Sequence, residues 1–246
     1  MTDPFAPFDN FSRRSPWKTV TRWLIVINIL VFLIDQLFLF KGLARYVTTS
    51  SGQFVPEGYD KAGNIVLAWQ PMLTSFLYFS VDKAIIAGQV WRFFTYQFTH
   101  ANLEHIALNM FGLLMAGPLV ESIMGRRRFL LFYLVCGAAG PAAHIGLSLL
   151  GVLSMNTITP LVGASASIYG VLVAAARIAP NEVVMLAFPP IDLKLRNFAM
   201  IVVGLSVAAV LFRWQNAGGH AAHIGGAVAG YFLSRRFAEK RLTPFM

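Results

Sequence analysis

Long apolar runs alternate with short polar or basic connectors along most of this chain. A helix needs about 20 apolar residues to cross the hydrocarbon core of a bilayer. The pattern predicts six such spans, at residues 20–40, 103–123, 129–153, 165–178, 198–212 and 221–237. No internal repeat is visible, so we expect one all-α, polytopic membrane protein domain with six transmembrane helices.

The spans divide the chain into a membrane domain at residues 20–237 and two tails, at residues 1–19 and 238–246. The connector at residues 41–100 is long, and its second half is apolar, so we expect part of it to lie in the membrane interface. No small-residue cleavage site follows the first apolar run, which predicts an uncleaved first span rather than a removable signal peptide.

The fourth predicted span is shorter than the others. Pro160 and Gly163 interrupt its beginning, and a clean helical pattern covers only the 14 residues 165–178. Such a helix rises about 21 Å, less than the roughly 30 Å of the hydrocarbon core. Non-helical backbone at membrane depth is tolerated only where protein or a water-filled cavity covers it. We therefore expect this helix to begin below the outer surface, at the centre of a ring of other helices.

Composition and charge support the same class of protein. Hydrophobic residues make up 57% of the chain and charged residues 13%, against about 25% charged residues in soluble domains. Most of the 20 lysines and arginines lie in the tails and in the connectors on the side of the tails. This positive-inside distribution predicts that both termini are cytoplasmic. Topology thus accounts for the net charge of +9, and we expect a lipid bilayer but no nucleic acid as a partner.

Three of the spans carry polar side chains in their first turns, namely His105 with Asn109, then Ser165, then His223. The second, fourth and sixth spans run in the same direction, so these side chains should lie at one depth, about 5–10 Å below the outer helix ends. A serine with a histidine is the minimum equipment for nucleophilic acyl transfer. We therefore interpret Ser165 and His223 as the centre of a protease that works inside the bilayer.

These side chains also have structural interpretations. A serine in a membrane helix usually bonds its own backbone or eases close packing, and a histidine can join two helices. Ser165 differs because it opens a helix after small residues, where its amide is free to bind an oxyanion. A zinc site is disfavoured, because asparagine is a poor ligand and Glu104 lies on a different face from His105.

The helix around His223 has the pattern of a closely packed helix. Gly226 and Gly230 form a small-xxx-small face, which lets two helices approach closely. His223 precedes Gly226 by about one turn on that face, so it should point at the contacted helix. His220 lies at the helix mouth and is expected to be exposed, whereas His144 is expected to lie in the core.

Taken together, the motifs resemble those of the rhomboid intramembrane serine proteases, over nearly all of the chain from the first span on. They are Trp91-Arg92, His100-x4-His105-x3-Asn109-Met110, Gly117-x3-Glu121-x3-Gly125, Gly163-Ala164-Ser165-Ala166 with Tyr169, and Ala222-His223-x2-Gly226. The chain departs from the family pattern at Ala166, where glycine is usual. The resemblance implies the six-helix bacterial type, with a ring of helices around a short central fourth helix.

The resemblance also implies a role for each residue. Ser165 would be the nucleophile and His223 its general base, with no third acidic residue. His105, Asn109 and the Ser165 amide would form the oxyanion hole, and Tyr169 would pack on the His223 ring. The supporting positions would be His100, Trp91, Arg92, Glu121, Gly163 and Gly226. Neither a metal nor another cofactor is implied.

The implied substrates are single-span transmembrane proteins, cut near the outer end of their span, and the implied location is a bacterial inner membrane. The fifth helix and the loop at residues 214–219 would act as gate and cap. A catalytically inactive rhomboid-like or derlin-like protein that binds membrane clients is the alternative, although retention of Ser165 and His223 together argues against it. A transporter is disfavoured because no inverted repeat is present. The sequence gives no indication of the oligomeric state.

Overall fold

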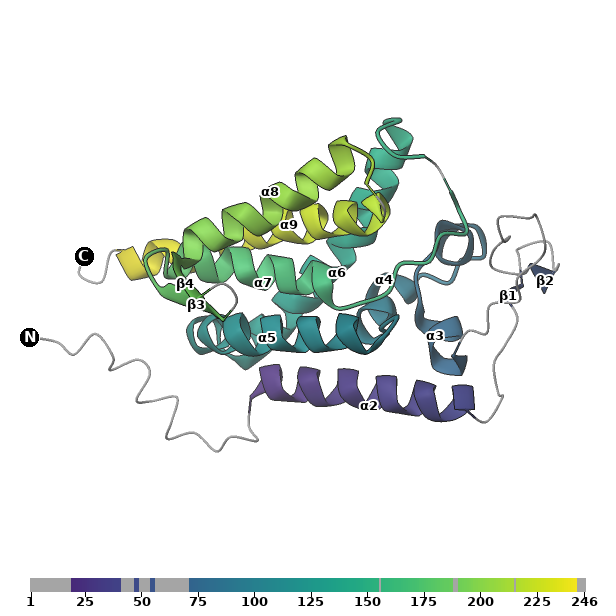
Figure 1. Ribbon diagram of the computed structural model, residues 1–246, viewed down its shortest axis with the longest axis horizontal. Helices are drawn as coiled ribbons and strands as arrows, with labels where there is room; N and C mark the ends of the chain where they lie inside the picture. The colour runs from purple at the N-terminus through teal and green to yellow at the C-terminus, as the bar shows by residue number, and fades with distance from the viewer. Residues whose placement is uncertain are drawn as a thin grey trace, which may run out of the picture.

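The computed structural model describes residues 19–40, 47–48, 54–55, 71–154, 156–187, 190–214 and 216–242. Within these residues, the longest elements are six helices that lie roughly along one axis (Figure 1). They are α2 (Val20–Phe40), α5 (Leu103–Met124), α6 (Arg126–Leu149), α7 (Ser165–Ile178), α8 (Leu195–Leu211) and α9 (Ala217–Leu242). Each coincides with one of the six predicted apolar segments, with ends displaced by several residues in α6, α8 and α9.

By length and composition, fewer of these helices qualify as membrane spans than the six that the sequence pattern predicted. In the described part of the chain, α2, α5 and α6 are long and apolar enough to cross a bilayer, while α7 and α8 are shorter apolar helices. The start and end of α7, at Ser165 and Ile178, agree with the predicted short helix. Its beginning follows Pro160 and Gly163, as the interruption in the pattern indicated.

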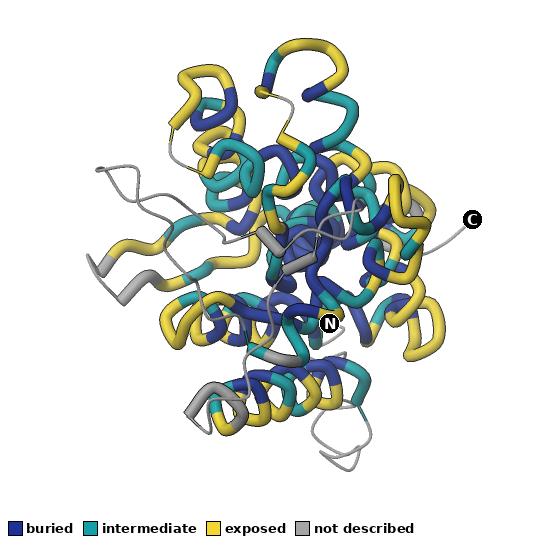
Figure 2. The backbone as a smooth tube through the Cα atoms, turned by 90° about the vertical axis from the view of Figure 1, so that its right-hand side faces the viewer, coloured by how far each residue is buried: buried dark blue, intermediate teal, exposed yellow. Residues whose placement is uncertain are grey.

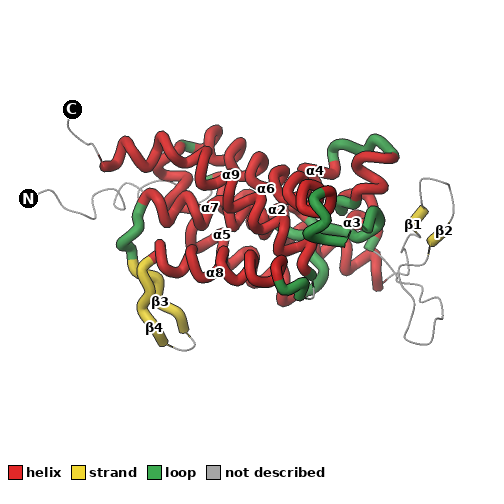
Figure 3. Tube along the Cα trace, turned by 90° about the horizontal axis from the view of Figure 1, so that it is seen from above, coloured by secondary structure: helices red, strands yellow, loops and turns green. Residues whose placement is uncertain are grey.

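The fold is mostly rather than wholly helical, so the all-α prediction is wrong for two segments. β1 (Val47–Thr48) pairs with β2 (Phe54–Val55), and β3 (Val183–Ala187) pairs with β4 (Pro190–Lys194), both antiparallel. The second hairpin joins α7 to α8 (Figure 3). Its first strand begins with adjacent β-branched residues, which favour extended backbone, in a stretch predicted only as a connector.

The described part of the connector between α2 and α5 folds into short helical elements at one end of the bundle (Figure 1). They are α3 (Met72–Leu77), the π-helical turn η2 (Asp82–Ile86), α4 (Arg92–Thr95) and the 3₁₀ turn η3 (Tyr96–Phe98). The expected placement of part of residues 41–100 in the membrane interface cannot be followed through residues 41–46, 49–53 and 56–70, which lie outside the described residues.

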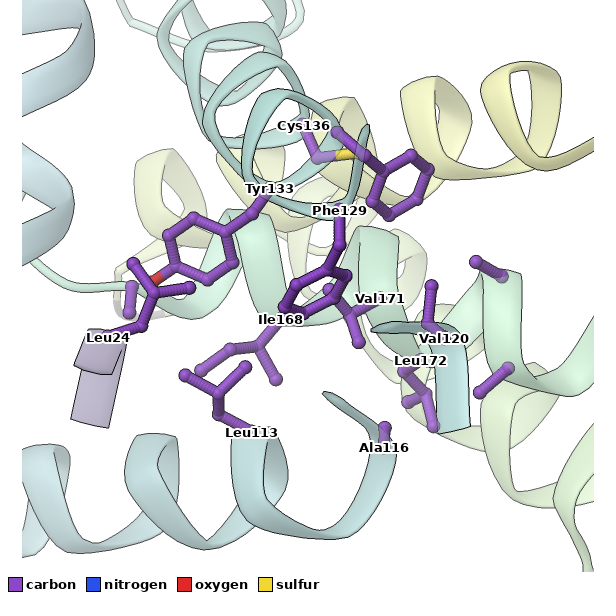
Figure 4. Close-up of a cluster of buried hydrophobic side chains, with 14 of the residues drawn as sticks. Leu24, Leu113, Ala116, Val120, Phe129, Tyr133, Cys136, Ile168, Val171 and Leu172 are labelled. Atoms are coloured by element: carbon purple, nitrogen blue, oxygen red, sulfur yellow. The ribbon is translucent and has the colours of Figure 1, made fainter. Parts of the chain in front are cut away.

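Helix α7 occupies the centre of the bundle, and it contacts α5, α6, α8 and α9. Ten of its 14 residues are buried. Viewed along the bundle, buried backbone gathers at the centre, and exposed residues gather outside it (Figure 2). Ile168 and Val171 of α7 meet Leu113 of α5 and Tyr133 of α6 in the main core cluster (Figure 4). Helix α2 instead lies against α5 (Figure 1), so the predicted ring is not closed around α7 by all five other helices.

The outward faces of these helices are apolar. Large hydrophobic side chains that are at least half exposed include Leu30 and Leu33 on α2, Leu108 and Phe111 on α5, and Met200 on α8. Soluble monomers rarely expose such continuous apolar surface, whereas lipid covers it at no cost. Together with the three long apolar helices, these faces identify an integral membrane protein.

Candidate active site

Ser165 and His223 come together as the sequence predicted. Ser165 is the first residue of α7 and His223 lies near the start of α9. The Oγ atom of Ser165 lies 2.8 Å from the Nε2 atom of His223, which is a hydrogen bond in either direction, depending on the histidine tautomer. Both side chains are partly buried. A hydroxyl in this position can pass its proton to the imidazole, which is the first requirement for a nucleophilic serine.

Close packing of α7 against α9 makes this hydrogen bond possible. A methyl group added at Gly226 would overlap the carbonyl oxygen of Ala166, and one at Gly230 would overlap the carbonyl oxygen of Gly170. The two backbones are therefore in contact at both positions, as the small-xxx-small pattern predicted. Since His223 lies about one turn before Gly226, the close contact between α7 and α9 places the His223 ring beside the beginning of α7.

The segment before α7 is held by the connector between α2 and α5. The backbones of Phe79 and Leu161 exchange two hydrogen bonds, of 3.1 and 2.7 Å, and the Gly163 amide donates to the Tyr96 carbonyl at 3.0 Å. Gly163 has a φ of 114°, a conformation that side-chain-bearing residues rarely adopt. This fixed turn sets where α7 begins, and the first amides of a helix have no partner within the helix. The Ser165 amide is among them.

Tyr169 stacks on the catalytic histidine candidate, as the resemblance implied. The ring centroids of Tyr169 and His223 are 4.2 Å apart and their planes differ by 18°. Tyr169 lies one turn after Ser165 on α7, so the same helix supplies the hydroxyl and the platform for the imidazole. The stacking limits rotation of the His223 ring and keeps Nε2 directed at Ser165.

His105 and Asn109 lie beside the turn that precedes Ser165. A methyl group at Gly163 would approach His105 Cε1 to 2.6 Å and Asn109 Nδ2 to 3.8 Å. Asn102 caps α5 by accepting a hydrogen bond from the His105 amide at 2.8 Å. Asn109 Nδ2 donates to the His105 carbonyl at 2.8 Å, which uses one of its two N–H groups. The second N–H group makes no hydrogen bond to the residues that the structure describes.

His100 supports His105 and is not in contact with the dyad, the pair formed by Ser165 and His223. The two rings meet edge to face, with centroids 5.1 Å apart. His100 is buried, and neither ring nitrogen has a hydrogen-bond partner among the described residues. Burial, followed by the neighbouring His105 ring, lowers the pKa of His100 to about 3. His100 is therefore neutral at physiological pH and serves as packing for the His105 ring.

The remaining supporting residues act at a distance from the dyad. Arg92 is buried and donates to the carbonyls of Tyr78 and Ser75, at 2.6 and 3.1 Å, so it joins parts of the connector between α2 and α5. Its neighbour Trp91 is exposed. The carboxylate of Glu121 accepts from the Val20 amide at 2.7 Å and from the amide and hydroxyl of Thr21 at 2.9 and 2.7 Å. Glu121 thus caps the N-terminus of α2.

Two polar residues near the dyad were missed or misplaced by sequence reasoning. Ser206 of α8 is fully buried, and its Oγ atom lies 3.4 Å from His223 Nδ1. His220, expected to be exposed, is half-buried, and its Nδ1 atom lies 3.2 Å from the same hydroxyl. Ser206 is the only hydroxyl-bearing residue in the apolar run 198–212, a signal that could have singled it out.

The expectation that His144 lies in the core is confirmed, because His144 is buried in α6. Ser167 of α7 is also buried, and its hydroxyl donates to Gln97 Oε1 at 2.6 Å. Among the residues that the structure describes, no three His, Cys, Asp or Glu side chains form a group that could hold a metal ion.

Comparison with known proteins identifies the same family that the sequence motifs resemble. A family model for the Rhomboid domain matches residues 87–240. Rhomboid protease GluP of Bacillus subtilis is 30% identical over 164 residues, 67% of this chain and 29% of that protein. Presenilin-associated rhomboid-like protein A, mitochondrial, of Danio rerio is 26% identical over 219 residues, 87% of this chain and 54% of that protein.

Rhomboid-related protein 3 of Homo sapiens is 29% identical over 229 residues, 89% of this chain and 47% of that protein. The chain thus spans between 29% and 54% of the length of these three relatives. The domain match covers more than half of the chain and includes all the helices from α5 to α9 apart from the last residues of α9. With this match and these relatives, the chain belongs to the rhomboid family.

Proposed function

We propose that this chain is an intramembrane serine endopeptidase that cuts single-span transmembrane proteins near the outer end of their membrane segment. The observation that carries the proposal is the 2.8 Å contact between Ser165 Oγ and His223 Nε2 at the start of the central helix. A catalytically inactive, client-binding rhomboid-like protein would have no need of this contact, of the Tyr169 stacking, or of free amides at the same place.

In the proposed reaction, His223 Nε2 accepts the hydroxyl proton as Ser165 Oγ attacks the carbonyl carbon of the scissile peptide. The carbonyl oxygen then carries negative charge, and the Ser165 amide, Asn109 and His105 donate hydrogen bonds to it. When the C–N bond breaks, His223 returns its proton to the leaving nitrogen. Water then attacks the acyl-serine, and His223 accepts the water proton and returns it to Ser165. None of these steps requires a cofactor.

The first experiment is covalent labelling of the full chain in lipid bilayers with a serine-reactive fluorophosphonate. The adduct is expected on Ser165, located by mass spectrometry, and labelling should be absent in Ser165→Ala. Ser234→Ala is the control, because Ser234 is also a helical serine, and its buried hydroxyl donates only to the Tyr231 carbonyl of its own helix. Equal labelling of parent and Ser165→Ala would refute the assignment and favour the client-binding alternative.

The oxyanion role of Asn109 gives a second expected result. Asn109→Ala should lower kcat by roughly 10- to 1000-fold, the scale for losing one oxyanion donor, with a smaller effect on KM. Steady-state cleavage of a single-span substrate in liposomes measures both constants. A raised KM with an unchanged kcat would instead assign Asn109 to substrate binding or to the structure of α5.

We further propose that all six long helices of residues 20–237 cross the membrane, with residues 1–19 and 238–246 as cytoplasmic tails. Arginines gather at the bundle end where α5, α7 and α9 finish, which supports this orientation. The bacterial origin of GluP supports a bacterial plasma membrane. In this arrangement α8 and residues 214–219 would admit the substrate from the lipid and cover the site.

This orientation predicts the reactivity of two introduced cysteines. The natural Cys136 is buried, so the parent chain should remain unlabelled by an impermeant thiol reagent. Ser154→Cys, at an exposed position between α6 and α7, should react in intact cells. Arg127→Cys, also exposed, should react only after the membrane is opened. The reverse pattern would invert the topology and place the dyad near the cytoplasmic face.

A further inference from the structure

The hydroxyl of Ser206 is a shared contact for three side chains of the candidate active site. Its Oγ atom lies 3.4 Å from His223 Nδ1, 3.2 Å from His220 Nδ1 and 3.2 Å from the Tyr169 hydroxyl oxygen. Ser206 is completely buried. It belongs to α8, whereas Ser165 and Tyr169 belong to α7 and the histidines to α9. One hydroxyl therefore links the outer helix α8 to the two helices that carry the dyad.

The Ser206 hydroxyl and its three neighbours have enough hydrogen atoms and lone pairs for all three hydrogen bonds to exist at once. A serine hydroxyl has one donor hydrogen and two acceptor lone pairs. If Nε2 of His223 is to accept the Ser165 proton, Nδ1 must carry the ring hydrogen and must donate it. Ser206 Oγ can accept that hydrogen and one from His220 Nδ1, while its own hydrogen is donated to the Tyr169 hydroxyl oxygen. The 3.4 Å distance is long for a strong hydrogen bond, as is common in active sites without substrate.

We propose that Ser206 is a positioning residue for the general base: it accepts the Nδ1–H hydrogen bond of His223, which selects the tautomer with a free Nε2 and orients the ring toward Ser165. This inference rests on the proposed function. A hydroxyl here takes the place that a carboxylate has in a three-residue protease site, and as a neutral acceptor it stabilises the protonated ring less than a carboxylate does.

The proposal also gives α8 a part in catalysis. When His223 accepts the Ser165 proton, both of its ring nitrogens carry hydrogen, and the Nδ1–H group needs a buried acceptor. Ser206 is the acceptor only while α8 is packed against α7 and α9. The His223 ring is therefore fully oriented only when α8 is in place. If an entering substrate displaces α8, this helix must return to its position before turnover.

The test compares Ser206→Ala with Ser206→Thr and with the matched control Ser234→Ala, all as full chains in liposomes. Two rates are measured, namely turnover of a single-span substrate and the second-order rate of fluorophosphonate labelling of Ser165. The small probe needs an oriented base but does not need the lateral entry of a transmembrane helix. We expect Ser206→Ala to lower kcat and the labelling rate about ten-fold each with little change in KM, and Ser206→Thr to restore both because it retains the hydroxyl.

Two results would overturn the proposal. One is a labelling rate of Ser206→Ala within two-fold of that of Ser234→Ala. The other is an equal loss of activity in Ser206→Ala and Ser206→Thr accompanied by a lowered Tm in both, which would make the residue structural. Failure of the proposed function is separate, because it would leave Ser165→Ala as reactive as the parent whatever the behaviour of Ser206.

Discussion

Alanine at Ser165 or at His223 is expected to reduce cleavage of a single-span substrate to the background rate, a loss of at least roughly 10⁴-fold. Without the hydroxyl there is no nucleophile, and without the imidazole no group within 2.8 Å can accept the proton. Members of such a unit are strongly non-additive, so the double variant should be no slower than either single variant. The measurement is turnover of the parent, both single variants and the double variant in liposomes.

The controls for this experiment separate chemistry from folding. Each variant should keep the thermal unfolding midpoint of the parent to within a few degrees, because Ser165 and His223 are only partly buried and neither fills the core. Ser234→Ala should cleave at the parent rate. Substantial turnover by either single variant would remove the dyad assignment, and additive losses in the double variant would mean that the two residues act independently.

A methyl group at Gly226 is expected to be nearly as damaging, for a different reason. In Gly226→Ala the new Cβ would overlap the carbonyl oxygen of Ala166, and backbone atoms cannot rotate away. Relief requires α9 to move from α7, at a cost at or above the roughly 1–3 kcal/mol typical of overpacked cores. A shift of about 1 Å between His223 and Ser165 lowers the rate by about 100-fold. Turnover and the unfolding midpoint should therefore both fall.

Gly146→Ala is the matched control for Gly226→Ala. Gly146 also lies inside a helix, α6, but a Cβ there would meet no atom within 4 Å. The unfolding midpoint of Gly146→Ala should equal or exceed that of the parent, because alanine has a higher helix propensity than glycine. If Gly226→Ala behaved like Gly146→Ala in both measurements, the close approach of α7 and α9 would not be what brings the dyad together.

The parts of this site that could be predicted from sequence depend on local patterns. Pro160 and Gly163 break the helical pattern immediately before Ser165, so the first residue of α7 could be located to the residue. The spacing of His223, Gly226 and Gly230 identified the packed face of α9. Equal depth across three helices that run in the same direction then indicated that Ser165 and His223 meet, and the structure confirms that contact.

Other features depend on contacts between segments far apart in sequence, which a pattern along one chain does not reveal. The rotation of α8 about its axis decides whether Ser206 faces lipid or His223, and one serine in an apolar run does not fix that rotation. His220 was expected to be exposed for the same reason, since its partner lies on α8. The β3–β4 hairpin was missed because a strand of five residues has too short a pattern to stand out between two helices.

Helix α2 shows how the order of synthesis bears on this fold. Glu121, which accepts from the first amides of α2, lies 100 residues beyond Thr21. A ribosome adding about 5–20 residues per second completes that stretch in about 5–20 s. At the other end of α2, Asp35 accepts from the Leu73 amide at 2.7 Å, only 38 residues later. The partner of Asp35 is therefore synthesised well before the carboxylate that accepts from the first amides of α2, which belongs to the second predicted span.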